Sequence, residues 1–141
     1  MTADNLTPLT PVEVLTEPQC WELLAQQQLG RLVVGQSGRV DIFPVNYVCD
    51  DHHLYFRTAE GTKLVELTLD DQVLFEVDHI DTDSGWSVVV RGTAQVLTSF
   101  TEMSRIDELG LQSWIPTPKY NIVNITATEI TGRSVYFTQQ A

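Results

Sequence analysis

The sequence predicts a mainly β domain, built as a barrel of six or seven strands with two or three short flanking helices. Short runs rich in Val, Ile, Tyr and Phe recur along the chain, and many are separated by short polar turns. Helical periodicity is confined to a few short windows. The runs LVV at 32–34 and VVV at 88–90 are apolar on both faces. We therefore expect helices or a second subunit to cover the outside of the barrel.

The length and charge of the chain limit the classes of protein to which it can belong. At 141 residues it is most simply one domain with a sizeable core. We expect residues 1–15, where prolines alternate with small and polar residues, to form an N-terminal arm, and residues 16–141 to form the domain. The 8 Lys and Arg against 19 Asp and Glu leave a net charge of −11. This charge argues against nucleic acid and anionic membranes as partners, since both select basic surfaces.

The compartment follows from the cysteines and from the N-terminus. Cys20 and Cys49 have neither the number nor the spacing of a disulfide framework or a metal site. The N-terminus lacks the basic and apolar regions of a secretion signal. No apolar run approaches the roughly 18 residues of a membrane span. We expect a cytoplasmic protein with reduced thiols.

The first helix is predicted from its capping residues. Thr16 and Gln19 have the spacing of a capping box, and Pro18 stands in the first turn. The apolar periodicity that follows predicts a helix to about Gln28, with Gly30 as its C-terminal stop.

Two further helices have weaker signals. Ser99 or Thr101 can cap an amphipathic helix that runs through Glu108 and is closed by Gly110. A short helix is also expected over Lys63–Leu69.

The strands are predicted from β-forming runs between turn residues. Ser37-Gly38 is expected to form a tight hairpin turn, and Pro44 to mark an edge, bulge or bend. Thr131-Gly132 is expected to separate the last two strands. The predicted strands are 31–36, 39–48, 53–58, 72–77, 86–97, 120–130 and 133–138, and the first three form a meander.

The chain is organised around the stretch HLYFRTAEGTKLVEL at 53–67. A strand leads through a polar turn into a predicted helix, and Arg57, Thr58, Thr62 and Lys63 surround the turn. Backbone N–H groups at a helix start, two hydroxyls and two cations together can bind a phosphate. The alternative is an ordinary turn that is capped by Thr62 and flanked by solvated cations.

Three motifs resemble one known family. They are PVNYV at 44–48, LYFRTAEGTKL at 54–64 and GWSVVVRGTAQVL at 85–97. In order and spacing they resemble the pyridoxamine 5′-phosphate oxidase-like, FMN-binding split-barrel family, over roughly residues 15–138. The resemblance implies that Arg57, Thr58, Thr62 and Lys63 bind the FMN phosphate and ribityl chain, with Gly61 allowing a close backbone approach.

The same resemblance implies contacts with the flavin ring. The PVNY strand runs beside the isoalloxazine in this family, which implicates Val45, Asn46 and Tyr47 through side chains or backbone. Trp86 and Ser87, at the start of a long strand, match another flavin-contacting position, although a tryptophan is more often a core or interface anchor. Family members are usually homodimers with two flavin sites at the interface, so one site can draw on both chains.

The chain also departs from the oxidases that give the family its name. Those enzymes carry a longer C-terminal segment with basic and aromatic residues, whereas this chain ends in GRSVYFTQQA, with Arg133 as the nearby cation. The short form is similar to flavin- or deazaflavin-dependent reductases and to nitroimidazole-resistance proteins. We therefore expect an FMN-dependent oxidoreductase acting on a small molecule, with no assigned catalytic residue. The alternatives are an F420-binding reductase of the same fold and a non-catalytic flavin- or haem-binding protein.

No metal site is predicted. His52 and His53 are adjacent and would point apart on a strand. An EF-hand loop counted from Asp81 would have Trp86 where glycine is needed and Gly92 where glutamate is needed. His52, His53 and His79 stay open as haem ligands.

Overall fold

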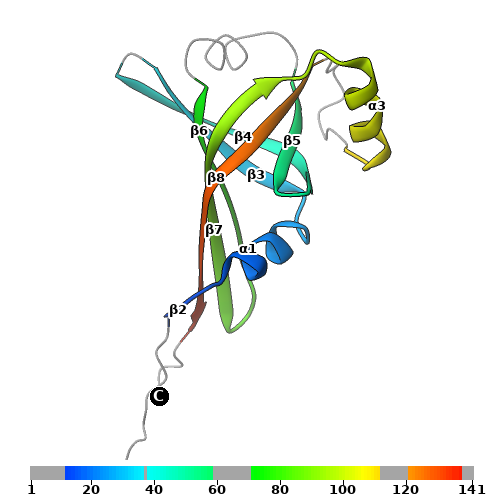
Figure 1. The fold of residues 1–141 in the computed structure, drawn as a ribbon. Helices are drawn as coiled ribbons and strands as arrows, with labels where there is room; N and C mark the ends of the chain where they lie inside the picture. Colours follow the sequence, from blue (N-terminus) through cyan, green and yellow to red (C-terminus); the bar gives the residue numbers. More distant parts are fainter. Residues whose placement is uncertain (1–11, 37, 59–70, 112–120, 138–141) are drawn as a thin grey trace, which may run out of the picture.

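The computed structural model describes residues 12–36, 38–58, 71–111 and 121–137 (Figure 1). Seven strands and two helices follow one another along this part of the chain. In order they are β2 (Val12–Val14), α1 (Glu17–Leu24), β3 (Leu29–Gln36), β4 (Arg39–Asp50), β5 (His53–Thr58), β6 (Gln72–Ile80), β7 (Ser84–Val96), α3 (Phe100–Glu108) and β8 (Asn121–Tyr136).

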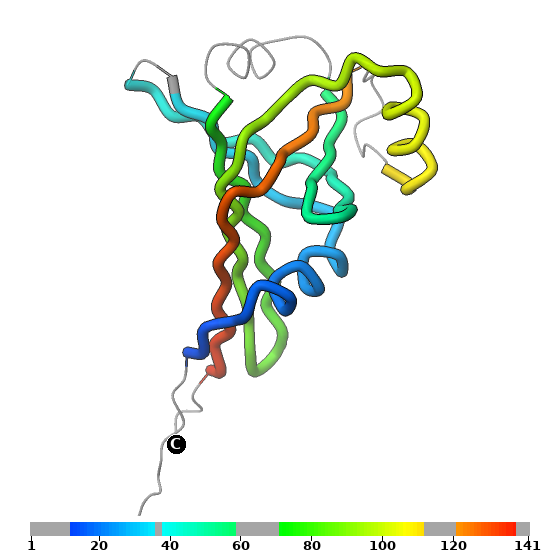
Figure 2. The backbone as a smooth tube through the Cα atoms, viewed as in Figure 1, coloured from blue at the N-terminus to red at the C-terminus, as the bar shows by residue number. Residues whose placement is uncertain are grey.

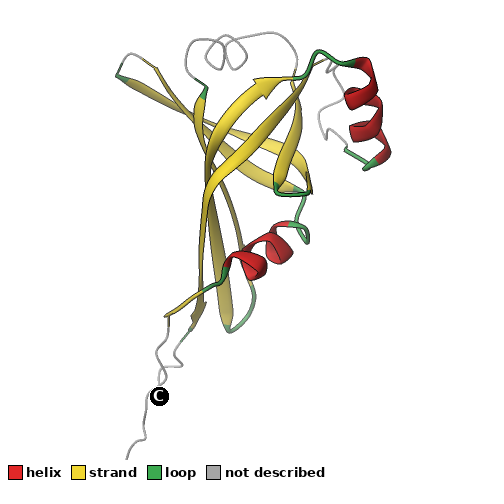
Figure 3. Cartoon of the chain, viewed as in Figure 1, coloured by secondary structure: helices red, strands yellow, loops and turns green. Residues whose placement is uncertain are grey.

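The strands form one antiparallel sheet that closes on itself. Their order is β2-β8-β5-β4-β3-β6-β7, and an additional pairing of β7 with β8 completes the ring. In Figure 2 the tube of β8 runs beside that of β7 over much of its length. Figure 3 shows both helices on one side of the barrel, while the β3–β4 hairpin extends from the other. The predicted split barrel with short flanking helices is confirmed.

The last strand does not have the predicted break. β8 runs through Thr131 and Gly132 without a turn, pairing first with β5 and later with β2. Gly132 serves close packing instead, because an added Cβ there would lie 2.7 Å from Sγ of Cys20 on α1. The strand β2 lies where the sequence predicted an arm, and its three residues pair with the far end of β8.

The two helix starts agree with the sequence prediction. The hydroxyl of Thr16 accepts from the Gln19 N–H, and the Gln19 side chain accepts from the Thr16 N–H, so the capping box is complete. Ser99 caps α3 in the same way through the Glu102 N–H.

The end of α1 differs from the prediction. The helix stops at Leu24, and Gly30 is already the second residue of β3. A Cβ on Gly30 would lie 2.4 Å from Cε2 of Phe75, so this glycine makes room for an aromatic ring and does not end a helix.

Buried apolar side chains form two clusters, one inside the barrel and one on its outer face. Inward side chains of every ring strand form one cluster, whose fully buried members include Leu32, Phe56, Phe75, Val88 and Ile125. A second cluster lies beneath α3, where Ile106 is buried against the outer face of the barrel. Its other buried members are Tyr55, Leu97, Leu111 and Ile122.

Two local features complete the frame around the site. Pro44 lies within β4, opposite Arg31 of β3 and outside the stretch of β4 that pairs with β5. Its missing N–H therefore interrupts no described β4–β5 pair. Asp51 and His52 have φ values of 48° and 66°, which makes the tight turn between β4 and β5.

Candidate functional site on the outer face of β4 and β5

The end of β5 separates the two residues that the sequence placed first in the anion site. Successive residues of a strand point to opposite faces. Thr58 is 2% exposed and lies with the inward-facing residues, whereas Arg57 is half-buried on the outside of the barrel. Arg57 is therefore the side chain of this pair that is available to an external anion.

The helix α3 lies against this outer face and contacts it through charged residues. The guanidinium of Arg57 forms an ion pair with the carboxylate of Asp107. Arg105 donates to Oδ2 of Asp50 at 2.6 Å and to the hydroxyl of Tyr55 at 3.1 Å. These bonds raise the pKa of Arg105 above its ordinary value. Two ion pairs and a buried isoleucine thus fix the position of α3 on β4 and β5.

The PVNY segment of β4 is also divided between two faces. Val45 and Tyr47 are buried inside the barrel, and the Tyr47 hydroxyl donates to the carbonyl oxygen of Leu24 at 2.6 Å. Asn46 lies between them on the outer face, and its Nδ2 donates to the carbonyl oxygen of Gln28 at 3.3 Å. A side-chain contact from this segment to an external ligand can therefore come from Asn46.

A pocket of about 310 Å³ lies over β4, between the ends of the two helices. Asn46, Val48 and Cys49 line it from β4. Burial raises the pKa of the Cys49 thiol to about 12, so this thiol is not poised as a nucleophile. The remaining lining residues are Leu24, Ala25, Gln27, Gln28, Tyr47, Leu109 and Gly110.

Arg57 does not line this pocket, but the strand register places it next to Asn46, which does. Tyr47 pairs with Phe56 between β4 and β5, so Asn46 and Arg57 flank that pair on the same side. Both side chains point outward. Asp107, the ionic partner of Arg57, is close in sequence to the pocket residues Leu109 and Gly110. The outer face of β4 and β5 thus combines a cation, an amide and a pocket.

Trp86 and Ser87, which the sequence also predicted to contact the flavin, lie far from Arg57 within one chain. Ser87 pairs with Asp78 and with Arg133, near the C-terminal end of β8, whereas Thr58 pairs with Asn121 at its start. Trp86 packs against the main core, with its ring centroid 6.4 Å from that of His79. One chain therefore does not bring Trp86 and Ser87 to Arg57. Gly61, Thr62 and Lys63 lie outside the described residues.

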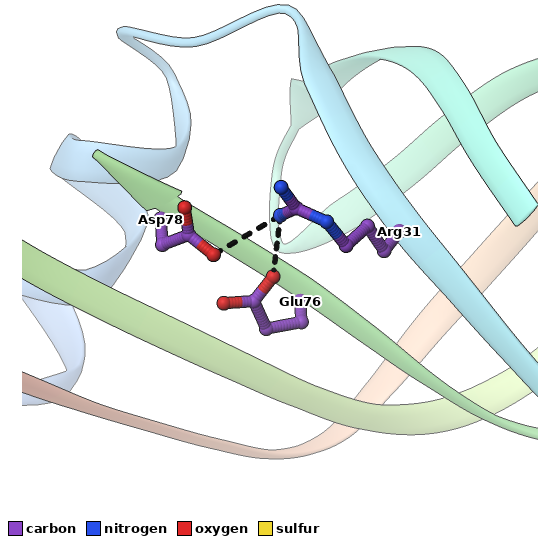
Figure 4. Close-up of polar contacts among 3 residues, drawn as sticks. All are labelled: Arg31, Glu76 and Asp78. Atoms are coloured by element: carbon purple, nitrogen blue, oxygen red, sulfur yellow. Dashed lines mark hydrogen bonds and ion pairs between the residues drawn. The ribbon is translucent and has the colours of Figure 1, made fainter. Parts of the chain in front are cut away.

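A charged cluster that the sequence reasoning missed lies on the outer face of β3 and β6. Nη1 of Arg31 bonds Oε1 of Glu76 at 2.8 Å and Oδ2 of Asp78 at 3.0 Å (Figure 4). Burial, and then the hydrogen bond and charge of Asp78, raise the pKa of Glu76 to about 7, against the opposing effect of Arg31. The sequence does mark this cluster, because Arg31 and Glu76 are charged residues among the apolar residues of two strands.

Among the residues that the structure describes, no three His, Cys, Asp or Glu side chains gather as metal ligands would. None of the described helices is long and apolar enough to cross a membrane.

The fold and this site define a closed antiparallel barrel that presents a cation beside a pocket on its outer face. The family model described as pyridoxamine 5′-phosphate oxidase matches residues 16–136. The chain therefore belongs to the pyridoxamine 5′-phosphate oxidase family, and the resemblance noted in the sequence is confirmed.

Solved structures and curated relatives agree with this membership. A Corynebacterium glutamicum protein, named for the pyridoxamine 5′-phosphate oxidases, is 41% identical with a TM-score of 0.83, covering 94% of this chain and 100% of its own. An FAD-binding protein of Mycobacterium smegmatis is 39% identical with a TM-score of 0.76, covering 88% of this chain and 98% of its own. An uncharacterised Mycobacterium tuberculosis protein is 30% identical over 125 residues, which are 84% of this chain and 82% of the relative.

Proposed function

We propose that the protein is a cytoplasmic, flavin-dependent oxidoreductase that binds FMN on the outer face of β4 and β5 and acts on a small molecule. The observation that carries this proposal is the outward position of Arg57, beside Asn46 and the pocket over β4. Family membership supports a flavin, and the charge of Arg57 suits the 5′-phosphate that FMN carries.

FMN and FAD share the chemistry that this site would recognise. Both have an isoalloxazine ring and a phosphate on the ribityl chain. FMN is the first candidate because the RTAEGTK motif resembles an FMN-phosphate segment, and FAD is the second because the M. smegmatis relative is an FAD-binding protein. F420, which also carries a phosphate, is the deazaflavin alternative.

The residues of this chain would hold the cofactor and exclude water from it. Arg57 would contact the phosphate, together with Thr62 and Lys63 as the family resemblance implies, and Asn46 would contact the ring. A bound flavin supplies the hydride or electron transfer. No side chain is then required as an acid or base.

The proposal includes a homodimer whose cofactor sites lie at the interface. On the outside of the β3–β4 hairpin, Val40 is 70% exposed, Ile42 60% and Leu29 40%. A second copy would remove these side chains from water. It would also allow Trp86 and Ser87 of one chain to approach the β4–β5 face of the other, which a single chain does not permit.

A non-catalytic flavin carrier or sensor is the second candidate. It is favoured by the name of the M. smegmatis relative, which states that this protein binds a flavin and states no reaction. Haem binding is the remaining alternative, and each of the three candidate histidines has a side-chain contact. His53 bonds Asn124 at 2.9 Å, His79 bonds Asp81 at 3.0 Å, and the His52 ring stacks on Trp21.

The visible absorption spectrum of the purified protein, before and after FMN is added, tests the proposal. We expect a flavin spectrum. The combined Arg57→Ala and Lys63→Ala variant should lose most FMN affinity and keep its fold. Arg91→Ala is the control, because Arg91 is an exposed cation on β7, away from β4 and β5. Protein that stays colourless with FMN, FAD and F420 would contradict a flavin function, and a haem spectrum would replace it with the haem alternative. If the protein binds flavin but no tested pair of electron donor and acceptor supports turnover, the carrier or sensor role would be favoured.

A further inference from the structure

Asp107 lies in the last turn of α3, where a carboxylate destabilises the helix. It is one of the last residues of α3, where the helix dipole is negative and an acidic side chain is unfavourable. Its side chain is 57% exposed, so it could be fully solvated. It pairs with Arg57 instead. The ion pair with Arg57 therefore offsets the unfavourable interaction of the Asp107 carboxylate with the helix dipole.

The geometry of α3 directs Asp107 to that partner. Ile106 is fully buried against the barrel, and its neighbours leave the helix about 100° to either side of it. Arg105 reaches Asp50 and Tyr55 on one side, and Asp107 reaches Arg57 on the other. The buried isoleucine and the bonds of Arg105 therefore fix the place of the Asp107 carboxylate.

A guanidinium can hold two anionic groups at once. It carries five N–H donors in a rigid plane, so a carboxylate on one edge leaves other donors for a phosphate. The Arg57 side chain is 23% exposed, and its ion pair with Asp107 involves Nη2. An arginine that is held in advance loses less conformational entropy when the phosphate binds.

We propose that Asp107 is a positioning residue, which orients Arg57 for the phosphate of the cofactor. This inference rests on the proposed function, since it requires Arg57 to contact that phosphate. Asp107 acts through Arg57 and does not touch the ligand. The carboxylate thus makes the site selective for phosphate-bearing flavins over riboflavin, which has the same ring and no phosphate.

A double-mutant cycle on Arg57 and Asp107 tests the proposal with FMN and riboflavin as the two probes. Asp107→Asn removes the charge of the ion pair, so it should hold Arg57 less firmly and weaken FMN binding about three- to tenfold. Riboflavin affinity should stay unchanged. In the Arg57→Ala background the Asp107 substitution should have no further effect on FMN, since its target is gone. Glu108→Gln, which removes the same charge one residue away, is the matched control and should bind both probes like the wild type.

The outcomes separate this inference from the proposed function. If Arg57→Ala leaves FMN affinity unchanged, the cofactor site itself is misplaced. If Arg57→Ala weakens FMN and Asp107→Asn does not, the positioning role is wrong and the site stands. Equal losses for FMN and riboflavin would make Asp107 merely structural. Tighter FMN binding by Asp107→Asn would mean that the carboxylate competes with the phosphate, and this would also overturn the proposal.

Discussion

Tyr47 on β4 donates a 2.6 Å hydrogen bond to the carbonyl oxygen of Leu24, the last residue of α1. The ring of Tyr47 also meets that of Phe75 edge to face, with 5.1 Å between centroids. Burial, with a smaller contribution from Cys49, raises the pKa of this phenol, so it remains a hydrogen-bond donor. Tyr47 therefore joins the helix end to the strand that carries Asn46.

We predict that Tyr47→Phe lowers the free energy of unfolding by about 1 kcal/mol, since it removes one buried hydrogen bond and keeps the ring. Flavin affinity should change little, because the ring is retained and the hydroxyl that is removed already bonds Leu24. Urea unfolding and FMN titration measure the two quantities. Tyr136→Phe is the matched control, because Tyr136 is 56% exposed, and it should change neither. A large loss of flavin affinity in Tyr47→Phe alone would mean that the hydroxyl reaches the ligand.

The raised pKa of Glu76 predicts that stability falls as the pH rises. Its folded-state pKa of about 7 lies above the ordinary value of 4.5, so the folded chain binds this proton more tightly than the unfolded chain. The contribution is complete below about pH 4.5 and is lost as the pH rises through about 7. Glu76→Gln should therefore show a smaller fall in Tm between about pH 5 and about pH 8 than the wild type.

The control for this pH effect is Glu22→Gln, because Glu22 is an exposed carboxylate on α1. Its pH profile should match that of the wild type. Circular dichroism melts at the two pH values are sufficient. The same slope in Glu76→Gln and in the wild type would show that the Arg31 cluster does not control this dependence.

Local chemistry made part of the fold predictable. The caps at Thr16 and Ser99 depend on residues three apart, and the period of two identifies most strands. The roles of two glycines could not be predicted from local sequence. Gly132 and Gly30 look like turn residues in the sequence, yet each accommodates a side chain from a distant segment. Only the folded arrangement reveals those neighbours.

The candidate site also has features that the sequence predicts and features that only the folded structure shows. The period of two already implies that Arg57 and Thr58 cannot both point outward from one strand, and the structure places Arg57 outside. The ion pair of Arg57 with Asp107 joins residues far apart in the sequence, and nothing local marks it. The position of Ser87 also depends on which part of β8 it pairs with, which is a property of the sheet register.

Packing at Gly132 predicts a large effect from one methyl group. An added Cβ would lie 2.7 Å from Sγ of Cys20 and 3.1 Å from carbons of Leu15 and Val88. We expect Gly132→Ala to lower the free energy of unfolding by about 1–3 kcal/mol, because α1 would have to move away from β8. Gly35→Ala is the control, since its nearest atoms lie at 3.8 Å, and we expect a change within about 0.5 kcal/mol. Equal stability of both variants, measured by urea unfolding, would contradict the close packing of α1.

The exposed apolar side chains of the β3–β4 hairpin predict a dimer that one charge can dissociate. Ile42 is 60% exposed, next to Val40 at 70%. Ile42→Asp would bury an unpaired carboxylate in each half of a symmetric interface, which is costly. We expect the wild type to elute as a dimer and Ile42→Asp as a monomer in size-exclusion chromatography with light scattering.

The control for the interface must be equally apolar and lie elsewhere. Phe100 at the start of α3 is 81% exposed, so Phe100→Asp should leave the dimer intact. The monomeric Ile42→Asp variant should also bind flavin more weakly, because Trp86 and Ser87 of the second chain would no longer contribute to the proposed shared site. A monomeric wild type would refute the shared site. A monomeric variant that keeps full FMN affinity would show that Arg57 and its neighbours bind the cofactor within one chain.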